Sequence, residues 1–412
     1  MPYQSDAGIV EIAVRNAVRA PYFSWKPFHR TTREEWQNIE RHQPAPWADF
    51  QSERYMMQVP TTWVSALEEP DTLMQNWDKA LDICSDLMGR PRDFGREILY
   101  NQVDLQLRGR ALHPGYPAGN RGFDPTEKTD GLSRHHLVRG PQYAHNYEFH
   151  ELGHAFLFPK FAGDREAAVN LLHVAVMHQA FDMDLNEAFR SSRYADDNPF
   201  MTLDNTAIEW MMSDNFVGDG FMLPHERAYQ LKGHAKYVDV ARLFGWDVIG
   251  NLFRLAHQDY MDGDPWPRNA AGEEGDIYTL RFSEAAEVDL RPLMHFWGVP
   301  IVNQNASDAA FLAATITPSQ RIYDTLIHYQ SLIPQDRDAF RSFAENWWQR
   351  QPSTEGFTTE RNHARRWESY DAEQAQIVYD TIQKIINQYF PTGRPQARNE
   401  ALDANRGVPT SP

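Results

Sequence analysis

The residues best suited to chemistry are His150, Glu151 and His154, in the pentapeptide His-Glu-Leu-Gly-His. Positions i and i+4 of an α-helix share a face, so the two imidazoles can bind one Zn²⁺. Glu151 can then reach a water molecule on that metal and act as its general base. Apolar residues at helical spacing predict the required helix over residues 147–158. The alternative is a pair of surface histidines on an ordinary helix.

A catalytic zinc site needs a third protein ligand and one open position. Downstream of the pentapeptide, Gly163 interrupts the chain and Asp164 is suited to cap a second helix. Glu166 then lies in the first turn of that helix, from which it can point at the metal. The spacing favours Glu166 as the third ligand and leaves Asp164, His173 and His178 as alternatives.

A long loop rich in Gly, Pro and His precedes the first of these helices, from Gly109 to about Gln142. A loop of this length inside a compact domain is usually functional or flexible. The phenols of Tyr116 and Tyr143 could donate a hydrogen bond to a developing oxyanion. His145 could line the cleft, although exposed loop histidines are common. These three side chains are therefore candidate substrate-binding residues.

The elements that must position these residues follow from hydrophobic periodicity. Short segments punctuated by proline over residues 1–65, and the alternation over 97–107, predict strands. A Thr-x-x-Glu capping pattern that begins at Thr32 predicts a short helix to about Arg41. The fold class is therefore α+β, with strands in the first third of the chain. Further helices are expected at 69–89, 147–158, 164–181, 205–213, 226–244, 246–260, 283–297, 307–315, 317–332, 335–349 and 367–389.

Three regions are expected along the chain. Residues 1–190 form a β-containing lobe that includes the HExxH helix. Residues 191–390 form an α-helical lobe that completes the catalytic domain. Residues 391–412 are polar, have little to bury, and are expected to form a disordered tail.

Composition excludes several classes of protein. The 412 residues include 40 Lys and Arg against 57 Asp and Glu, and the resulting net charge of −17 argues against nucleic-acid binding. No apolar run approaches the ~18–20 residues of a membrane span. The single cysteine, Cys84, excludes an intrachain disulfide. The polar start of the chain predicts no signal peptide. We also expect the protein to be a monomer.

Five segments carry a pattern that is specific only as a set. The segments are Ala-Pro-Trp-Ala-Asp-Phe at 45–50 followed by Val-Pro at 59–60, His-Pro-Gly-Tyr-Pro at 113–117, His-Glu-Leu-Gly-His at 150–154, Glu-x-x-x-Asn at 166–170, and Asp-Leu at 289–290 followed by Phe-Trp-Gly at 296–298. Together they resemble the enhancin-like, mucin-degrading metallopeptidases of the gluzincin type, over about residues 8–300.

The resemblance implies a zincin metallopeptidase lobe with a mixed sheet and an active-site helix, followed by a mainly helical lobe. It implies one catalytic Zn²⁺ held by His150, His154 and Glu166, with Glu151 as the base. It adds His113 to the candidate substrate-binding residues. It also implies activity on O-glycosylated, mucin-like proteins, and therefore a secreted or cell-surface location.

Three functions compete at this point. The first is a zinc endopeptidase that cleaves O-glycosylated proteins. The second is a non-catalytic glycan- or protein-binding module on the same fold, favoured by Ala155 and Leu157, which stand where the family commonly has Asn and Gln. The third is a general endopeptidase or aminopeptidase without glycan dependence. An aminopeptidase would need acidic residues that bind a free amine near the metal, and the sequence identifies none.

Overall fold

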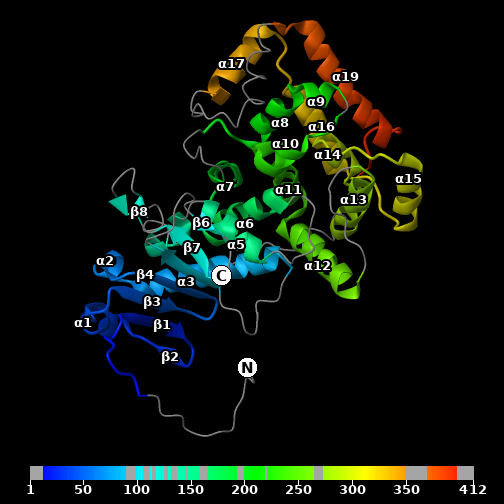
Figure 1. Ribbon diagram of the computed structural model, residues 1–412. Helices are drawn as coiled ribbons and strands as arrows, with labels where there is room; N and C mark the ends of the chain where they lie inside the picture. Colours follow the sequence, from blue (N-terminus) through cyan, green and yellow to red (C-terminus); the bar gives the residue numbers. More distant parts are fainter. Residues whose placement is uncertain are drawn as a thin grey trace. The chain divides into compact units, whose positions relative to one another are not determined.

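The computed structural model describes residues 13–89, 99–104, 112–113, 117–121, 123–124, 129–130, 137–143, 146–156, 165–192, 199–218, 220–263, 272–348 and 369–396 (Figure 1). The chain divides into two compact units. The first comprises Met1–Asp78 and Glu97–Tyr143, and the second comprises Lys79–Arg96 and Ala144–Pro412. The HExxH helix lies in the second unit. The lobes predicted from the sequence, residues 1–190 and 191–390, remain predictions. Most of the predicted tail, from residue 397 on, lies outside the described residues.

A seven-stranded mixed sheet forms the framework of the first unit, in the order β2-β1-β3-β4-β5-β7-β6. The pairs β1–β3, β4–β5 and β5–β7 are parallel, and β1–β2, β3–β4 and β6–β7 are antiparallel. A separate pair, β8 and β9, is antiparallel. The strands are β1 (Tyr22–Lys26), β2 (His29–Arg30), β3 (Trp47–Gln51), β4 (Tyr55–Pro60), β5 (Leu99–Asp104), β6 (Leu112–His113), β7 (Ala118–Arg121), β8 (Phe123–Asp124) and β9 (Thr129–Asp130).

Alternating burial along β3 and β4 directs every second side chain into the core of this unit. Phe23 and Phe50 are fully buried, and the Phe50 ring packs against Trp36 of helix α1 (Arg33–Asn38) at 5.0 Å between centroids. The predicted capping pattern is present, because the Thr32 hydroxyl accepts a hydrogen bond from the Glu35 amide at 3.0 Å. The unit also contains α2 (Thr61–Val64) and two 3₁₀ turns, η1 (Glu40–His42) and η2 (Pro141–Tyr143).

The described part of the second unit is made of helices. Together with the mixed sheet of the first unit, these helices confirm the α+β class. Helix α3 (Pro70–Leu87) begins in the first unit and ends in the second. The others are α5 (Asn146–Phe156), α6 (Arg165–Ala180), α7 (Leu185–Ser191), α8 (Leu203–Met211), α9 (Asp214–Val217), α10 (Pro224–Tyr229), α11 (Leu231–Phe244), α12 (Trp246–Asp262), α13 (Glu273–Ala286), α14 (Arg291–Phe296), α15 (Gln304–Ala313), α16 (Gln320–Ser331), α17 (Arg337–Trp348) and α19 (Ala372–Tyr389).

Two of the predicted helices are each divided in two. The helix expected over 226–244 is α10 followed by α11, because Gln230 is extended (φ −102°, ψ 156°). The chain turns tightly there: a Cβ on Gly233 would lie 2.1 Å from the Arg227 carbonyl oxygen. The helix expected over 283–297 is the end of α13 followed by α14. Here Glu287 takes the left-handed conformation (φ 56°) that ends α13.

Helix α7 is not among the predicted helices. Its N-cap is Asp184, whose carboxylate accepts hydrogen bonds from the amides of Asn186 and Glu187 at 2.9 and 3.2 Å. This is the ordinary role of an aspartate before a helix. The helix is only 7 residues long, and a segment this short carries too weak a periodic pattern to be recognised.

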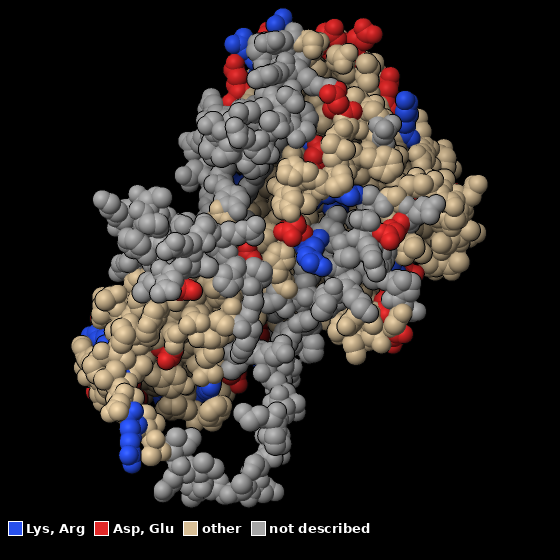
Figure 2. Space-filling model, in the orientation of Figure 1, with Lys and Arg blue, Asp and Glu red and all other residues tan. Residues whose placement is uncertain are grey.

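On the face drawn in Figure 2, the Lys and Arg side chains of the described residues are interspersed with Asp and Glu side chains and form no extended basic patch. Among the described helices, none is both long enough and apolar enough to cross a membrane.

Candidate metal centre

Helices α5 and α6 pack closely because the residue between them is glycine. A Cβ on Gly153 would lie 2.7 Å from the Leu172 Cδ1 atom and 2.9 Å from two side-chain atoms of Val169. Any larger residue would therefore push α6 away from α5. The glycine of the pentapeptide thus determines how near the residues of α6 come to His150 and His154.

Helix α6 is a rigid support for the side chains at its start. Eleven of its residues are buried, and it packs against α5, α7, α10 and α11. Glu166 and Asn170 are half-buried members of its first turns, on the part of the helix that approaches α5. A side chain anchored on a packed helix loses less entropy on binding a ligand than one on a loop.

Three side chains converge between these helices. The Nε2 atoms of His150 and His154 are 3.3 Å apart. The Glu166 Oε2 atom lies 3.3 Å from the Nε2 atom of His150 and 3.6 Å from that of His154. Within the part of the chain that the structure describes, this is the one cluster of three or more His, Cys, Asp or Glu side chains arranged to hold a metal ion.

The spacing of these three atoms fits a tetrahedral ion. Zinc binds nitrogen and carboxylate oxygen at about 2.0–2.1 Å, so two of its ligand atoms lie about 3.3–3.4 Å apart. The observed separations of 3.3, 3.3 and 3.6 Å agree with this value. The three side chains are between 17% and 30% exposed, so the cluster is partly accessible to solvent.

Asn170 orients the first histidine. Its Oδ1 atom lies 2.9 Å from the Nδ1 atom of His150, and its Nδ2 atom donates to the backbone carbonyl of Glu166 at 3.0 Å. Because the amide nitrogen is thereby engaged, the Asn170 oxygen faces His150 and accepts a hydrogen bond from the protonated Nδ1 atom. This leaves the lone pair of neutral His150 on Nε2, the atom that faces Glu166 and His154.

The charge and the burial of these three side chains favour the binding of a cation. Burial lowers the pKa of His154, which favours the neutral imidazole. Burial also opposes protonation of His150, but hydrogen bonds with Glu166 and Asn170 outweigh it and raise its pKa. The hydrogen bond with His150 holds the pKa of Glu166 below its ordinary range. The negative potential that draws a proton to His150 would equally draw a metal cation.

Glu151 lies beside the cluster and is half-buried. Its carboxylate is near enough to His150 to contribute to the raised pKa of that histidine. It is one step round the helix from His150, so it can reach a water molecule at the fourth position without being a ligand itself.

The described alternatives for the third ligand are engaged elsewhere. The Nε2 atom of His173 lies 2.9 Å from the Ser191 hydroxyl, and the Nδ1 atom of His178 accepts a hydrogen bond from the Trp246 indole at 3.2 Å. Asp164 lies outside the described residues. Glu166 is therefore the candidate that the structure brings to both histidines of the pentapeptide.

The candidate substrate-binding residues are less well defined. Tyr143 is 54% exposed, and the Arg139 guanidinium lies 4.6 Å from the centre of its ring. His113 is in β6, but its side chain lies outside the description, as do Tyr116 and His145. Their roles remain predictions. Sequence reasoning missed the role of Asn170, although its position four residues after Glu166 on a helix was the available signal.

A family profile described as "Peptidase M60, enhancin and enhancin-like" matches residues 16–298 of this chain. The chain belongs to this family. Membership confirms the resemblance of the five segments, and the family is one of metallopeptidases, which implies a metal ion.

Curated relatives of this M60 chain carry names that describe an association. It is 26% identical over 318 residues to mouse "TRPM8 channel-associated factor 3", covering 76% of the chain and 31% of that protein. It is 24% identical over 334 residues to human "TRPM8 channel-associated factor 2", again covering 76% and 31%. The chain thus spans about a third of the length of these relatives.

Solved structures share the fold. A conserved protein of unknown function from Bacillus anthracis matches with a TM-score of 0.54 and 14% identity, over 73% of this chain and 58% of that one. The ZmpB metallopeptidase from Clostridium perfringens matches with a TM-score of 0.50 and 13% identity, over 74% and 58%. At these identities the likeness concerns the fold alone.

Two of the family's segments have structural roles in this M60 chain. The segments at 45–50 and 59–60 belong to the antiparallel strands β3 and β4, where Ala48 pairs with Val59. At the other end, Gly298 takes a positive φ of 79°, and a Cβ there would lie 2.6 Å from the Met222 Cβ atom. Trp297 donates from its indole to buried Asp239 at 3.0 Å. The first of these segments therefore belongs to the core of the first unit, and the second belongs to the core of the second unit, which contains the metal centre.

Proposed function

We propose that this chain is a zinc-dependent endopeptidase whose metal is held by His150, His154 and Glu166. The observation that supports this most is the convergence of the three ligand atoms at separations of 3.3, 3.3 and 3.6 Å. A site with three protein ligands and an open fourth position is the form that catalytic zinc takes.

The chain's own residues supply proton transfer and orientation. Zinc, when bound, would polarise the scissile carbonyl and lower the pKa of a water molecule. Glu151 accepts a proton from the attacking water and returns it to the leaving amine as the carbon–nitrogen bond breaks. Asn170 holds the ring of His150 in place, so that no reorganisation is needed during the reaction.

We propose an O-glycosylated, mucin-like protein as the substrate, in a secreted or cell-surface setting. The support is the enhancin-like set of segments. Binding energy from the sugar would position the scissile carbonyl beside the metal site. The net charge of −17 gives no electrostatic attraction to sialylated mucins, so short neutral glycans are the favoured decoration.

The second candidate is a non-catalytic binding module on the same fold. What favours it is that curated relatives are named for their association with a channel rather than for a reaction. An intact HExxH with a converging glutamate argues against it, because a module that only binds has no need of a general base beside a metal site.

A matched pair of Ser/Thr-rich peptides tests the proposal. One peptide carries N-acetylgalactosamine near its centre and the other is bare, and both have acetylated N-termini so that aminopeptidase activity is excluded. We expect the wild type to cleave the glycosylated peptide internally. Glu151→Gln retains shape but not basicity, so turnover should fall at least ~10²-fold while zinc stays bound.

The outcomes separate the candidates. Equal cleavage of both peptides would indicate a general endopeptidase. Undiminished turnover by Glu151→Gln would remove Glu151 from the mechanism. Cleavage of neither peptide by zinc-loaded protein, with binding of the glycosylated one, would favour the binding module. Glu187→Ala, on an exposed face of α7, is the matched control and should behave as the wild type.

A further inference from the structure

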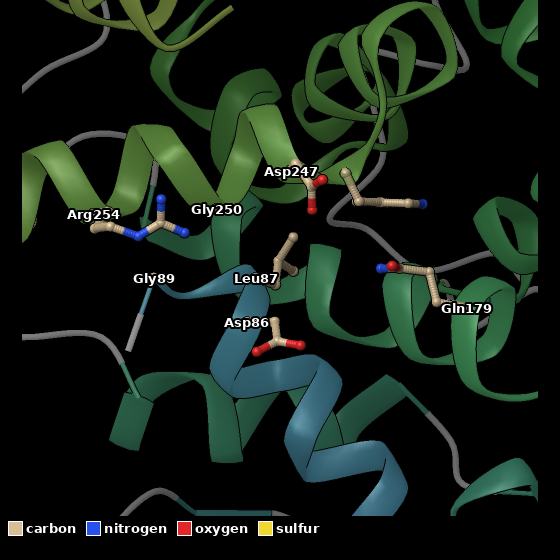
Figure 3. Close-up of a pocket in the computed structure, with 8 residues that line it drawn as sticks. Asp86, Leu87, Gly89, Gln179, Asp247, Gly250 and Arg254 are labelled. Carbon is tan, nitrogen blue, oxygen red and sulfur yellow. The ribbon is translucent and has the colours of Figure 1, made fainter. Parts of the chain in front are cut away.

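A cavity of about 500 Å³ lies between the end of α3, the end of α6 and the start of α12 (Figure 3). Several of its lining side chains are already satisfied within the fold. Arg254 donates to the Asn251 side chain at 2.5 Å. The Trp246 indole donates to His178 at 3.2 Å, and Leu87 is buried. Side chains that remain open to a partner are found instead on the β1–β2 hairpin of the first unit.

This hairpin ends in an exposed aromatic tip. Lys26 pairs with His29 across the two strands, so Pro27 and Phe28 form the turn between them. Phe28 is 84% exposed, the largest value for a large hydrophobic side chain among the described residues. Figure 1 shows β2 as the outermost strand of the sheet, so the hairpin has a neighbouring strand on one side only. A single exposed ring says little by itself, but the charges beside this one are informative.

Two cations flank the tip without acidic partners. Within the described residues, neither Lys26 nor Arg30 forms an ion pair. Their charged groups lie against aromatic rings instead. The Lys26 Nζ atom is 5.5 Å from the centre of the Phe28 ring, and the Arg30 guanidinium is 4.3 Å from that of Trp25. A contact with a neutral ring leaves the charge of a cation uncompensated. The tip therefore combines an exposed apolar ring with two positive charges.

The sequence around the hairpin has the same character. Residues 13–33 contain five Lys or Arg and no Asp or Glu, in a chain whose net charge is −17. Two of the five, Arg19 and Arg33, form ion pairs with acidic residues from outside this segment. The other three, Arg15 and the two cations of the hairpin, form none within the described part of the chain. A basic segment in an acidic protein indicates an anionic partner.

We propose that the β1–β2 hairpin docks on a bilayer that contains anionic phospholipids, with the Phe28 ring in the interface. The negative surface potential of such a bilayer attracts Lys and Arg. An aromatic ring gains by entering the boundary between the headgroups and the acyl chains. The long side chains of Lys26 and Arg30 can keep their charges among the phosphates while Phe28 enters the apolar layer.

Other partners would use less of this surface. A soluble polyanion would compensate Lys26 and Arg30 but leave Phe28 in water. A peptide strand added at the edge of the sheet would find few backbone groups, because β2 is only two residues long. A bilayer uses both the charges and the ring.

Sedimentation with vesicles tests the docking. One set of vesicles is phosphatidylcholine alone, and the other contains about 30% phosphatidylserine, which supplies the negative surface potential. We expect the wild type to bind the anionic vesicles and not the neutral ones. Phe28→Ser, and separately Lys26→Gln/Arg30→Gln, should weaken the binding at least about tenfold. No binding to the anionic vesicles, or undiminished binding by both variants, overturns the proposal.

Matched controls show whether the hairpin itself is responsible. Leu312→Ser removes a side chain that is 80% exposed on α15. Lys384→Gln/Arg341→Gln removes two charges from exposed positions on α19 and α17. Both proteins should bind as the wild type does. Glu166→Ala should also bind normally, since the docking does not depend on the proposed peptidase function. Controls that bind as weakly as the hairpin variants would overturn the proposal.

A fluorophore at the tip distinguishes a bilayer from a soluble polyanion. The native Cys84 is fully buried, and burial raises the pKa of its thiol, so it should not react with a label. Phe28→Cys labelled with nitrobenzoxadiazole should give brighter, blue-shifted emission on anionic vesicles and no change with dextran sulfate. Labelled Leu312→Cys should change with neither. The absence of a shift on vesicles, or an equal shift with dextran sulfate, overturns the insertion of the tip into a bilayer.

Discussion

Two polar clusters in the second unit differ in how their charges are satisfied. Asp239 is fully buried, and its two oxygens accept four hydrogen bonds: two from Arg242, one from Trp297 and one from Tyr329, at 2.7–3.0 Å. In the metal centre, two imidazole nitrogens and a carboxylate oxygen converge on one position. The first cluster fills a carboxylate with protein donors, and the second turns three ligand atoms toward a common point.

The difference separates a structural cluster from a functional one. A buried carboxylate whose acceptors are all filled by protein donors stabilises the packing of the helices that supply them. Three ligand atoms that converge at separations of 3.3–3.6 Å have the spacing of a metal site, so this cluster is arranged for binding. The two clusters should therefore respond differently to substitution.

The largest effect is expected for Glu166→Ala. The protein should change from about one bound zinc per chain to none, because two histidines alone hold the ion weakly. Elemental analysis after dialysis measures this, and circular dichroism should show that the helices persist. Glu187→Ala should keep its zinc. If Glu166→Ala also keeps one zinc per chain, the third ligand is another residue, and Asp164 is the next candidate.

The next effect is expected for Asp239→Ala. Removing the acceptor leaves the Trp297 indole and the Tyr329 hydroxyl buried without it, and the usual cost of breaking such a buried pair is about 3–5 kcal/mol. The midpoint of thermal unfolding should fall clearly, while folded protein at low temperature still binds one zinc. Asp262→Ala, at an exposed position, should change the midpoint little. Zinc loss from folded Asp239→Ala would mean that the two clusters are not separate.

The smallest effect is expected for Asn170→Ala. His150 would keep its place on α5 but lose the partner of its Nδ1 atom, and loss of such a partner typically weakens metal binding about 10–100-fold. Competition with a chromophoric chelator measures the affinity. Asn170→Asp, which keeps an oxygen acceptor, should restore most of it. Equal affinity in Asn170→Ala and the wild type would show that His150 needs no orienting partner.

Local sequence was sufficient for most elements. The capping pattern at Thr32 predicted α1, and the apolar spacing near His150 predicted α5, because both signals depend only on residues within two turns of each other. The same locality explains the errors. The division between α10 and α11 depends on how closely the Arg227 carbonyl approaches Gly233. The spacing of apolar residues along the sequence does not report that distance.

The sequence by itself determined which residues could do chemistry, since two histidines and a glutamate at fixed helical spacing share a face wherever the helix lies. Only the tertiary structure decided which residue completes the set. Asp164, Glu166, His173 and His178 were open alternatives until the packing of α5 on α6 through Gly153 brought Glu166 to the two histidines and left His173 with Ser191. The physical reason is that a metal site is a relation between helices: its ligand distances depend on how side chains pack between them, and that packing is not encoded in the spacing along either one.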